Sequence, residues 1–188
     1  MKQRIEAVLN ESIEVKKAAI QQCLPAIERA AQLIERAFRN NNRVFFCGNG
    51  GSAADSQHIA AEFIGRFQKE RRALPAIALT TDTSILTCLT NDYSYDIVFS
   101  RQLEALGCKG DVIVGFSTSG KSANVIKAFE RAKEMGIASI AFVGHDGGPM
   151  GKTADIAIIV PSKVTARIQE CHIAIAHAVC EVVENAFV

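Results

Sequence analysis

The sequence predicts a doubly wound α/β fold, with a parallel five-stranded sheet between layers of helices, preceded by two N-terminal helices. From about residue 44 onward, short apolar segments alternate with stretches of helical periodicity. Several of these segments are apolar throughout, which is typical of parallel strands that are buried on both faces. Ligands of such sheets bind at the carboxyl ends of the strands. The loops that follow the strands are therefore the first place to look for function.

The elements follow one another without a repeat or a linker. Apolar residues recur at helical spacing from Lys2 to about Gln22, and a second amphipathic run follows Pro25, a residue that suits the first turn of a helix. Five strand-like runs come next: Val44–Cys47, Ala76–Leu79, Val112–Phe116, Ser139–Val143 and Ile156–Val160. A long helix is expected from Val164 to about Asn185. We expect residues 1–188 to form one domain, of which residues 1–40 are a part.

Composition excludes several classes of protein. The chain has 188 residues and a formal charge of +1, which gives no general attraction to nucleic acid or to anionic membranes. Its six cysteines form no Cys-x-x-Cys pair and read as reduced thiols. No apolar segment has the length of a signal peptide core or of the ~20 residues that a membrane span needs. We expect a cytoplasmic protein.

A glycine-rich loop, Gly48 to Ala53, follows the first strand. It matches the Gly-x-Gly-x-x-Ala pattern of dinucleotide-binding loops, and Asp82 after the second strand could contact a ribose. The match is unspecific, because any loop that brings backbone N–H groups to an anion favours glycines. A nicotinamide or flavin site is the less favoured interpretation.

The loop after the third strand, Gly115 to Ser122, fits the Gly-x-x-x-x-Gly-Lys-Ser pattern of nucleotide P-loops. However, no neighbouring apolar strand ends in the acidic residue that would hold magnesium, and P-loops usually follow the first strand. Four hydroxyl groups precede the next helix instead, on Ser117, Thr118, Ser119 and Ser122. Hydroxyls and N–H groups at a helix N-terminus can bind a terminal phosphate. The sequence therefore predicts a phosphate-binding loop.

Imidazoles and carboxylates suggest a metal site. His58 and Glu62 stand four residues apart on one face of the helix after the glycine-rich loop, where they could bind one divalent metal. The last helix carries polar residues in an otherwise apolar stretch: Gln169, Glu170, His172 and His177. Periodicity does not choose between His172 and His177 as a further ligand. We interpret His145, in a loop, as structural.

Five segments appear in order: GNGGSAADSQHIAAEF, TTDTS, NDY, GFSTSGKSANVIKA and ARIQECHIAIAH. Through them the sequence resembles the phosphoheptose isomerases, or sedoheptulose-7-phosphate isomerases, of the sugar isomerase (SIS) domain superfamily, over essentially the whole chain. The resemblance implies a flavodoxin-like SIS fold and a cytoplasmic homotetramer. It also implies conversion of D-sedoheptulose 7-phosphate to D-glycero-D-manno-heptose 7-phosphate for the heptose of bacterial lipopolysaccharide core.

The resemblance also implies roles for individual residues. One Zn²⁺ per site would be held by His58, Glu62, Gln169 and His177, which favours His177 over His172. Glu62 and His177 would be the catalytic acid/base pair. The substrate-binding residues would be Asn49, Gly50, Gly51, Ser52, Glu62, Asn91, Asp92, Ser117, Thr118, Ser119, Ser122 and Gln169. Lys121 occupies a variable place in the family, so we expect no specific role for it.

The chemistry fits these residues, since moving a proton between adjacent sugar carbons needs a base, an acid/base for the oxygens and a cation. The alternative is a non-catalytic SIS tetramer that binds the bacterial replication initiator. Such relatives need not keep both Glu62 and His177, and the presence of both favours the enzyme. A phosphosugar-sensing domain is disfavoured for the same reason.

Gln169 and His177 are eight residues apart, about 12 Å along a helix axis. Two such side chains cannot easily meet at one metal from one straight helix. Either the helix is broken between them, where there is no Pro or Gly, or they reach a given metal from different subunits. We favour active sites that are shared between subunits.

Overall fold

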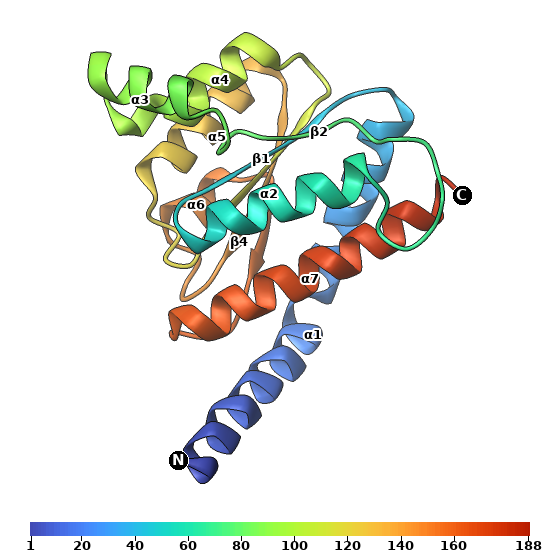
Figure 1. Cartoon of the computed structure of the whole chain (residues 1–188), viewed down its shortest axis with the longest axis vertical. Coiled ribbons are helices and arrows are strands. Elements are labelled where there is room, and N and C mark those ends of the chain that lie inside the picture. The colour runs from blue at the N-terminus through green and yellow to red at the C-terminus, as the bar shows by residue number, and fades with distance from the viewer.

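The computed structural model describes residues 1–188 and contains a five-stranded, all-parallel sheet (Figure 1). Its order is β2-β1-β3-β4-β5. The strands are β1 (Val44–Gly48), β2 (Ala76–Ala78), β3 (Val112–Ser117), β4 (Ala138–Val143) and β5 (Ile156–Ile159). Each lies where an apolar run of the sequence predicts it, so the predicted α/β fold with five parallel strands is confirmed.

Helices cover both faces of this sheet. They are α1 (Lys2–Arg39), α2 (Gly51–Ile64), α3 (Thr83–Asp92), α4 (Val98–Leu106), α5 (Ala123–Met135), α6 (Gly148–Thr153) and α7 (Thr165–Asn185), with a 3₁₀ turn, η1 (Tyr95–Ile97). Buried residues of α1, α2 and α7 form one core cluster with the sheet, and those of α4, α5 and α6 form another. The predicted final helix is confirmed as α7.

Strand β1 shows why the sheet needs both layers. All five of its residues are buried. Val44 and Phe46 belong to the cluster under α1, α2 and α7, whereas Phe45 and Cys47 belong to the cluster on the opposite face. Successive side chains of a strand point to opposite faces, so a strand that is apolar throughout requires cover on both.

The prediction of two N-terminal helices is wrong, because α1 is one continuous helix of 38 residues with Pro25 inside it. Buried residues of α1 lie on both sides of the proline, with Cys23 before it and Ala30 after it, and the helix packs against α7 and β5. Pro25 itself is exposed. Tertiary packing along one face therefore outweighs the lost backbone hydrogen bond of a solvent-facing proline.

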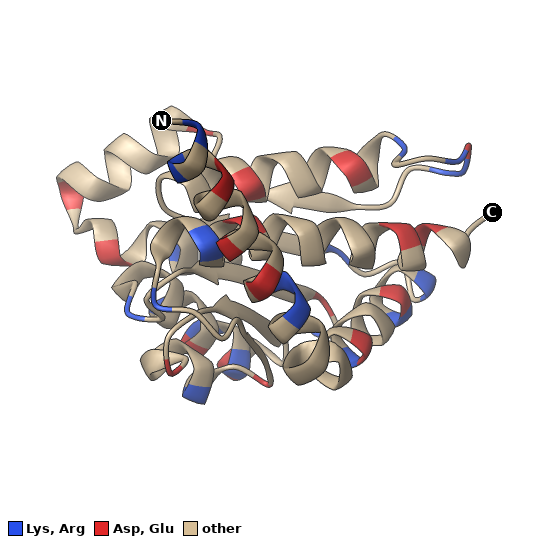
Figure 2. Cartoon of the chain, turned by 90° about the horizontal axis from the view of Figure 1, so that it is seen from below, with Lys and Arg blue, Asp and Glu red and all other residues tan.

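The N-terminal part of α1 extends away from the body of the molecule (Figure 1). It carries exposed apolar side chains at Ile5, Leu9 and Ile13. Figure 2 shows basic and acidic residues interspersed along α1 and over the other helices, in keeping with the balanced net charge. No helix combines the length and the apolar character that crossing a membrane would require.

The position of Pro25 generates a stability prediction. Pro25→Ala should raise the free energy of unfolding by about 1–3 kcal/mol, because a helix-interior proline forfeits a hydrogen bond and crowds the preceding turn. Urea titration measures the change. Gln22→Ala, also exposed on α1, removes no backbone bond and should change stability by less than about 0.5 kcal/mol. A loss of stability in Pro25→Ala would show that α1 needs the proline.

Candidate active site

The carboxyl ends of β1 and β3 bring two predicted loops to one edge of the sheet. The strands are direct neighbours, with Gly48 opposite Phe116. The loops are joined by a pair of amides: Asn49 Nδ2 donates to Asn124 Oδ1 at 3.0 Å, and Asn124 Nδ2 donates to Asn49 Oδ1 at 2.8 Å. The hydroxyl of Tyr95 also donates to Asn49 Oδ1, at 3.1 Å. The predicted substrate residue Asn49 is thus held by two side chains that the sequence analysis did not single out.

The hydroxyl-rich loop lies before α5, as predicted. Ser117 Oγ and Ser122 Oγ are 2.8 Å apart, and Ser119 Oγ accepts a bond from the backbone N–H of Lys121 at 3.3 Å. Gly120 has a φ of +66°, and a Cβ there would lie 2.2 Å from the carbonyl oxygen of Gly147. The loop therefore curls tightly, with hydroxyls at the N-terminus of a 13-residue helix. Such a terminus favours an anionic group.

The glycine-rich loop makes room for the last helix. A Cβ on Gly51 would lie 1.9 Å from Nε2 of Gln169, so α7 approaches the start of α2 where there is no side chain. Gly50 has a φ of +56°, a conformation that glycine adopts without steric cost. The predicted residues Gly51 and Gln169 are therefore neighbours within one chain.

Three of the four predicted metal ligands gather between α2 and α7. His58 Nε2 lies 3.2 Å from Glu62 Oε1 and 2.9 Å from His177 Nε2. One ligand atom from each of the three residues lies within 4.8 Å of the others. The side chain of His58 is 51% exposed and that of Glu62 is 23% exposed. Two imidazole nitrogens and a carboxylate oxygen that converge from accessible side chains fit the donor set of a catalytic zinc site.

Asp55 lies one turn before His58 on α2 and was not among the residues predicted from the sequence. Its Oδ2 is buried without a hydrogen-bond partner. Burial raises the pKa of this carboxyl, and interactions with Gln169, His58 and His177 act in the opposite direction. The three-residue spacing to His58 was the available signal in the sequence, since residues i and i+3 share a helix face. A partly buried carboxyl therefore lies beside the three ligands.

Helix α7 is continuous from Thr165 to Asn185. This continuity excludes a break between Gln169 and His177, which was the less favoured of the two alternatives. Gln169 lies against Gly51, whereas His177 meets His58 two turns further along α2. The ~12 Å of axial separation between these two residues of α7 remains, as the spacing of the sequence requires.

The predicted residues Asn91 and Asp92 lie at the end of α3, a helix without a buried residue. Asn91 Nδ2 donates to Asp92 Oδ1 at 2.8 Å, and the thiol of Cys88 donates to Asp92 Oδ2 at 3.4 Å. Both residues are exposed. Their side chains thus bond within α3 and not to the loops after β1 and β3.

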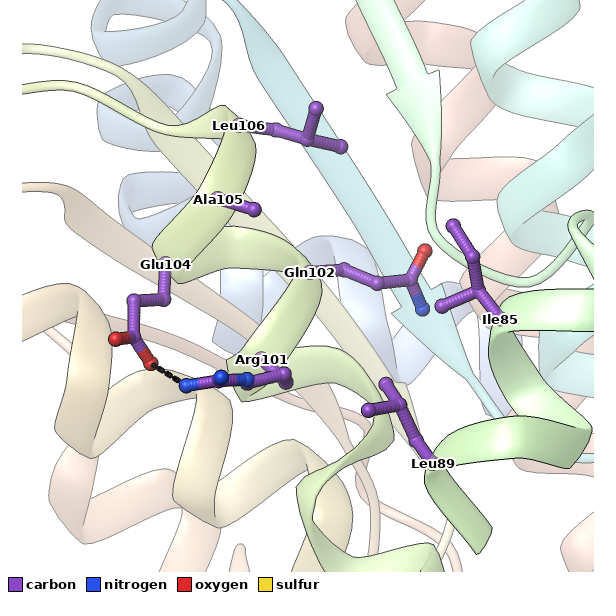
Figure 3. A pocket seen from close by; sticks show the side chains of 7 residues that line it. All are labelled: Ile85, Leu89, Arg101, Gln102, Glu104, Ala105 and Leu106. Atoms are coloured by element: carbon purple, nitrogen blue, oxygen red, sulfur yellow. Dashed lines mark hydrogen bonds and ion pairs between the residues drawn. The ribbon is translucent and has the colours of Figure 1, made fainter. Parts of the chain in front are cut away.

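A pocket between α3 and α4 is not part of this site (Figure 3). Its lining includes Ile85, Leu89 and Gln102, and an ion pair between Arg101 and Glu104 at 3.4 Å. The amide nitrogen of Gln102 donates to the carbonyls of Leu79 and Val98. None of the lining residues belongs to the predicted site.

His172, the alternative to His177, is fully buried between α7 and the sheet. Its ring packs against Phe116 and Phe142, with centroids 6.1 and 5.8 Å away, and neither ring nitrogen has a hydrogen-bond partner. Burial lowers the pKa of His172 from 6.5 to about 4. His172 is therefore a neutral core residue at neutral pH, while His177 joins His58 and Glu62.

The buried His172 predicts acid sensitivity. The unfolded chain protonates this imidazole near pH 6.5, whereas the folded chain resists protonation until about pH 4. Its contribution to stability is therefore complete above pH 6.5 and is lost as the pH falls, by about 3 kcal/mol at pH 4. His172→Leu should flatten the dependence of the free energy of unfolding on pH over this interval, measured by urea titration in chelator. An unchanged slope would contradict the assignment.

Comparison with known proteins identifies the family. The model of the SIS domain family matches residues 9–144. Phosphoheptose isomerase from Clostridium acetobutylicum is 51% identical over 187 residues, which cover 98% of this chain and 95% of the relative. The phosphoheptose isomerase from Aquifex aeolicus is 52% identical over 185 residues, which cover 98% of this chain and 97% of the relative.

Solved structures agree with the sequence relatives. The phosphoheptose isomerase from Neisseria gonorrhoeae superposes with a TM-score of 0.93 at 45% identity and covers 98% of both chains. One from Francisella tularensis superposes with a TM-score of 0.94 at 34% identity and covers 97% of both chains. Because these matches extend over nearly the full length of both partners, the chain belongs to the phosphoheptose isomerase family of SIS-domain enzymes.

Proposed function

We propose that this isomerase converts D-sedoheptulose 7-phosphate to D-glycero-D-manno-heptose 7-phosphate, which supplies the heptose of lipopolysaccharide core. The observation that carries this proposal is the meeting of Glu62 with the two imidazoles of His58 and His177 between α2 and α7. Helix α2 starts from the sheet edge that also bears the hydroxyl-rich loop. A base, a proton carrier and a phosphate-binding loop are the parts that this reaction requires.

The acid/base chemistry follows from the two titratable groups. Glu62 removes a proton from C1 of the ketose, and an enediolate forms with negative charge on the oxygen of C2. His177 carries the proton from the oxygen on C1 to the oxygen on C2. Glu62 then returns its proton to C2, which completes the aldose and restores both side chains. The net change is a shift of two hydrogens between adjacent carbons and their oxygens, without an external oxidant or reductant.

We propose that one Zn²⁺ binds per site through His58, Glu62 and His177, with Gln169 as the fourth ligand. When bound, the ion supplies positive charge that stabilises the negative charge developing on the substrate oxygens. The mixed nitrogen and oxygen donors of these side chains suit zinc. The amide of Gln169 adds a neutral oxygen donor to the set.

The substrate contacts are proposed from the two loops and from α3. The phosphate binds to Ser117, Thr118, Ser119 and Ser122, where hydroxyls meet a helix N-terminus. The sugar contacts Asn49, Gly50, Gly51 and Ser52, and also Glu62, Asn91, Asp92 and Gln169. The amide pair with Asn124 supports this role, because it fixes the Asn49 side chain at the strand ends.

We also propose that residues 1–188 act as one SIS domain that works in the cytoplasm as a homotetramer. The projecting part of α1 supports an oligomer, since its apolar residues Ile5, Leu9 and Ile13 are exposed in the single chain. Because Gln169 and His177 of one chain face different parts of α2, we propose that each site combines these ligands from different subunits. The isomerase relatives disfavour the alternative of a non-catalytic adaptor.

The base is tested by Glu62→Gln. The amide cannot accept a proton, so turnover should fall by about 10²–10⁴-fold while the fold is kept. NMR of purified protein with sedoheptulose 7-phosphate follows aldose formation. Glu70→Gln is the matched control, since its carboxylate is exposed and pairs with Arg66. Turnover near normal in Glu62→Gln would remove Glu62 from the role of base.

Phosphate recognition is tested by comparing hydroxyls with the nearby cation. Ser119→Ala or Ser122→Ala removes a donor to a charged acceptor, which should weaken substrate binding by ~1.5–3 kcal/mol. Lys121→Ala should have a smaller effect, because recognition depends on the hydroxyls. The Michaelis constants for the sugar phosphate give the comparison. If the lysine variant raised the constant more than both serine variants, a P-loop-like role for Lys121 would replace this proposal.

Shared sites are tested by complementation. Oligomers that mix Gln169→Ala chains with His177→Ala chains should regain part of the activity, because some sites then draw both ligands from intact chains. Each variant assembled alone should stay inactive. Verified hetero-oligomers that recover no activity would count against sharing.

A further inference from the structure

The segment between α2 and β2 is held by one buried carboxylate. Glu184, near the end of α7, is 1% exposed and accepts backbone N–H bonds from Phe67 at 2.8 Å, Gln68 at 2.8 Å and Lys69 at 2.9 Å. Figure 1 shows this segment curving beside the C-terminal end of α7. Three bonds from consecutive residues to one side chain fix the course of the backbone there.

Arg71 completes the arrangement. Its side chain is fully buried, and its Nε lies 3.4 Å from Glu184 Oε1. Its other nitrogens donate to the carbonyls of Glu62 and Gly65, both at 2.7 Å. Burial alone would raise the pKa of Glu184, but the three N–H groups and Arg71 outweigh it and hold the pKa below its usual value. The segment is therefore tied to α7 by the carboxylate of Glu184 and to the end of α2 by the guanidinium of Arg71.

The first residue that Glu184 holds covers the catalytic imidazole. The ring of Phe67 stacks on His177 with a centroid distance of 5.5 Å and an interplanar angle of 29°. His177 and Glu184 are seven residues apart on α7, close to two full turns, so both face the same side of the helix. One helix thus carries both the imidazole and the anchor for the ring that lies on it.

An imidazole needs such support because the second side-chain torsion of histidine is broadly distributed. In this site Nε2 of His177 must point at His58, 2.9 Å away. An aromatic ring packed flat on the imidazole restricts that rotation. A segment that only connected α2 to β2 would not need an aromatic side chain at position 67, over His177.

We propose that Phe67 is a positioning residue that sets the orientation of the His177 ring, and that Glu184, together with Arg71, holds Phe67 in place. The inference deepens the proposed function and rests on the role assigned there to His177. Groups that orient a metal ligand from outside typically change metal affinity or activity by ~10–100-fold when removed. A stacked pair alone corresponds to about a three- to tenfold change in the equilibrium that it favours.

The test compares Phe67→Leu, Phe67→Tyr and the control Phe187→Leu. Phe187 is also half-buried, but its ring packs on Phe38, Arg39 and Arg72 and stacks on no histidine. The first readout is NMR of protein labelled at the Cε1 positions of its four histidines. The second is the dissociation constant for Zn²⁺, measured against a competing chelator. Neither readout uses the substrate.

Phe67→Leu should shift the His177 signal, since the ring current of Phe67 is lost, and should weaken Zn²⁺ binding by about three- to tenfold. The signals of His145 and His172 should stay in place. Phe67→Tyr keeps the ring and should remain within about twofold of the unmodified protein. An unmoved His177 signal with unchanged Zn²⁺ affinity in Phe67→Leu would overturn the proposal, as would an equal effect of Phe187→Leu.

The role of Glu184 is tested by a double-mutant cycle on Zn²⁺ affinity. If Glu184 acts through Phe67, Glu184→Gln should weaken binding on its own and add little to Phe67→Leu. Additive effects would overturn this part of the proposal. If circular dichroism shows that Glu184→Gln does not fold, Glu184→Asp takes its place, because it keeps the charge and withdraws the carboxylate. Failure of the unmodified protein to isomerise sugar phosphate would overturn the proposed function and leave these substrate-free results standing.

Discussion

The arrangement depends most on the parallel pairing of β1 with β3 in the middle of the sheet. The register from Val44 opposite Val112 to Gly48 opposite Phe116 makes both strands end at the same edge. Both strands are buried along their whole length, and a slip by one residue would turn each apolar side chain toward the wrong layer. The glycine-rich loop and the hydroxyl-rich loop therefore meet because the core fixes the register, and the amide pair of Asn49 and Asn124 connects them there.

The second constraint is the close approach of α7 to α2. The two helices meet at Gly51 with Gln169 near the start of α2, and at His58 with His177 two turns later, so they run in the same direction. A side chain at position 51 would displace Gln169. This approach sets three ligand atoms within 4.8 Å of one another although they come from distant parts of the chain. The chemistry of the site thus depends on the packing of two helices on one face of the sheet.

These two constraints explain which features the sequence could predict. Short-range patterns in the sequence predict the uniformly apolar strands and the loops that follow them. They also predict that His58 and Glu62, four residues apart, share one helix face. They do not predict the continuity of α1 through Pro25, because it depends on packing of Cys23 and Ala30 against other elements. Periodicity alone also left the choice between His172 and His177 open, and the family resemblance favoured His177. The structure gives the physical reason, because His172 is buried in the core whereas His177 lies beside His58 and Glu62. The roles of Phe67 and Glu184 depend on partners that no local pattern predicts, and the sequence hints at Asp55 only through its spacing to His58.

The carboxyl groups of Glu184 and Asp55, both near the site, differ in how their negative charge is compensated. Glu184 has three N–H donors and Arg71, so its negative charge is compensated within the chain. Asp55 is half-buried: its Oδ2 is buried without a hydrogen-bond partner, although Gln169 interacts with the carboxyl, and the group lies beside His58, Glu62 and His177. An uncompensated buried carboxylate is costly unless positive charge is close to it. A divalent cation bound by those three ligands would favour the charged form of Asp55, so the position of Asp55 supports the metal site by an argument separate from the distances between the ligand atoms.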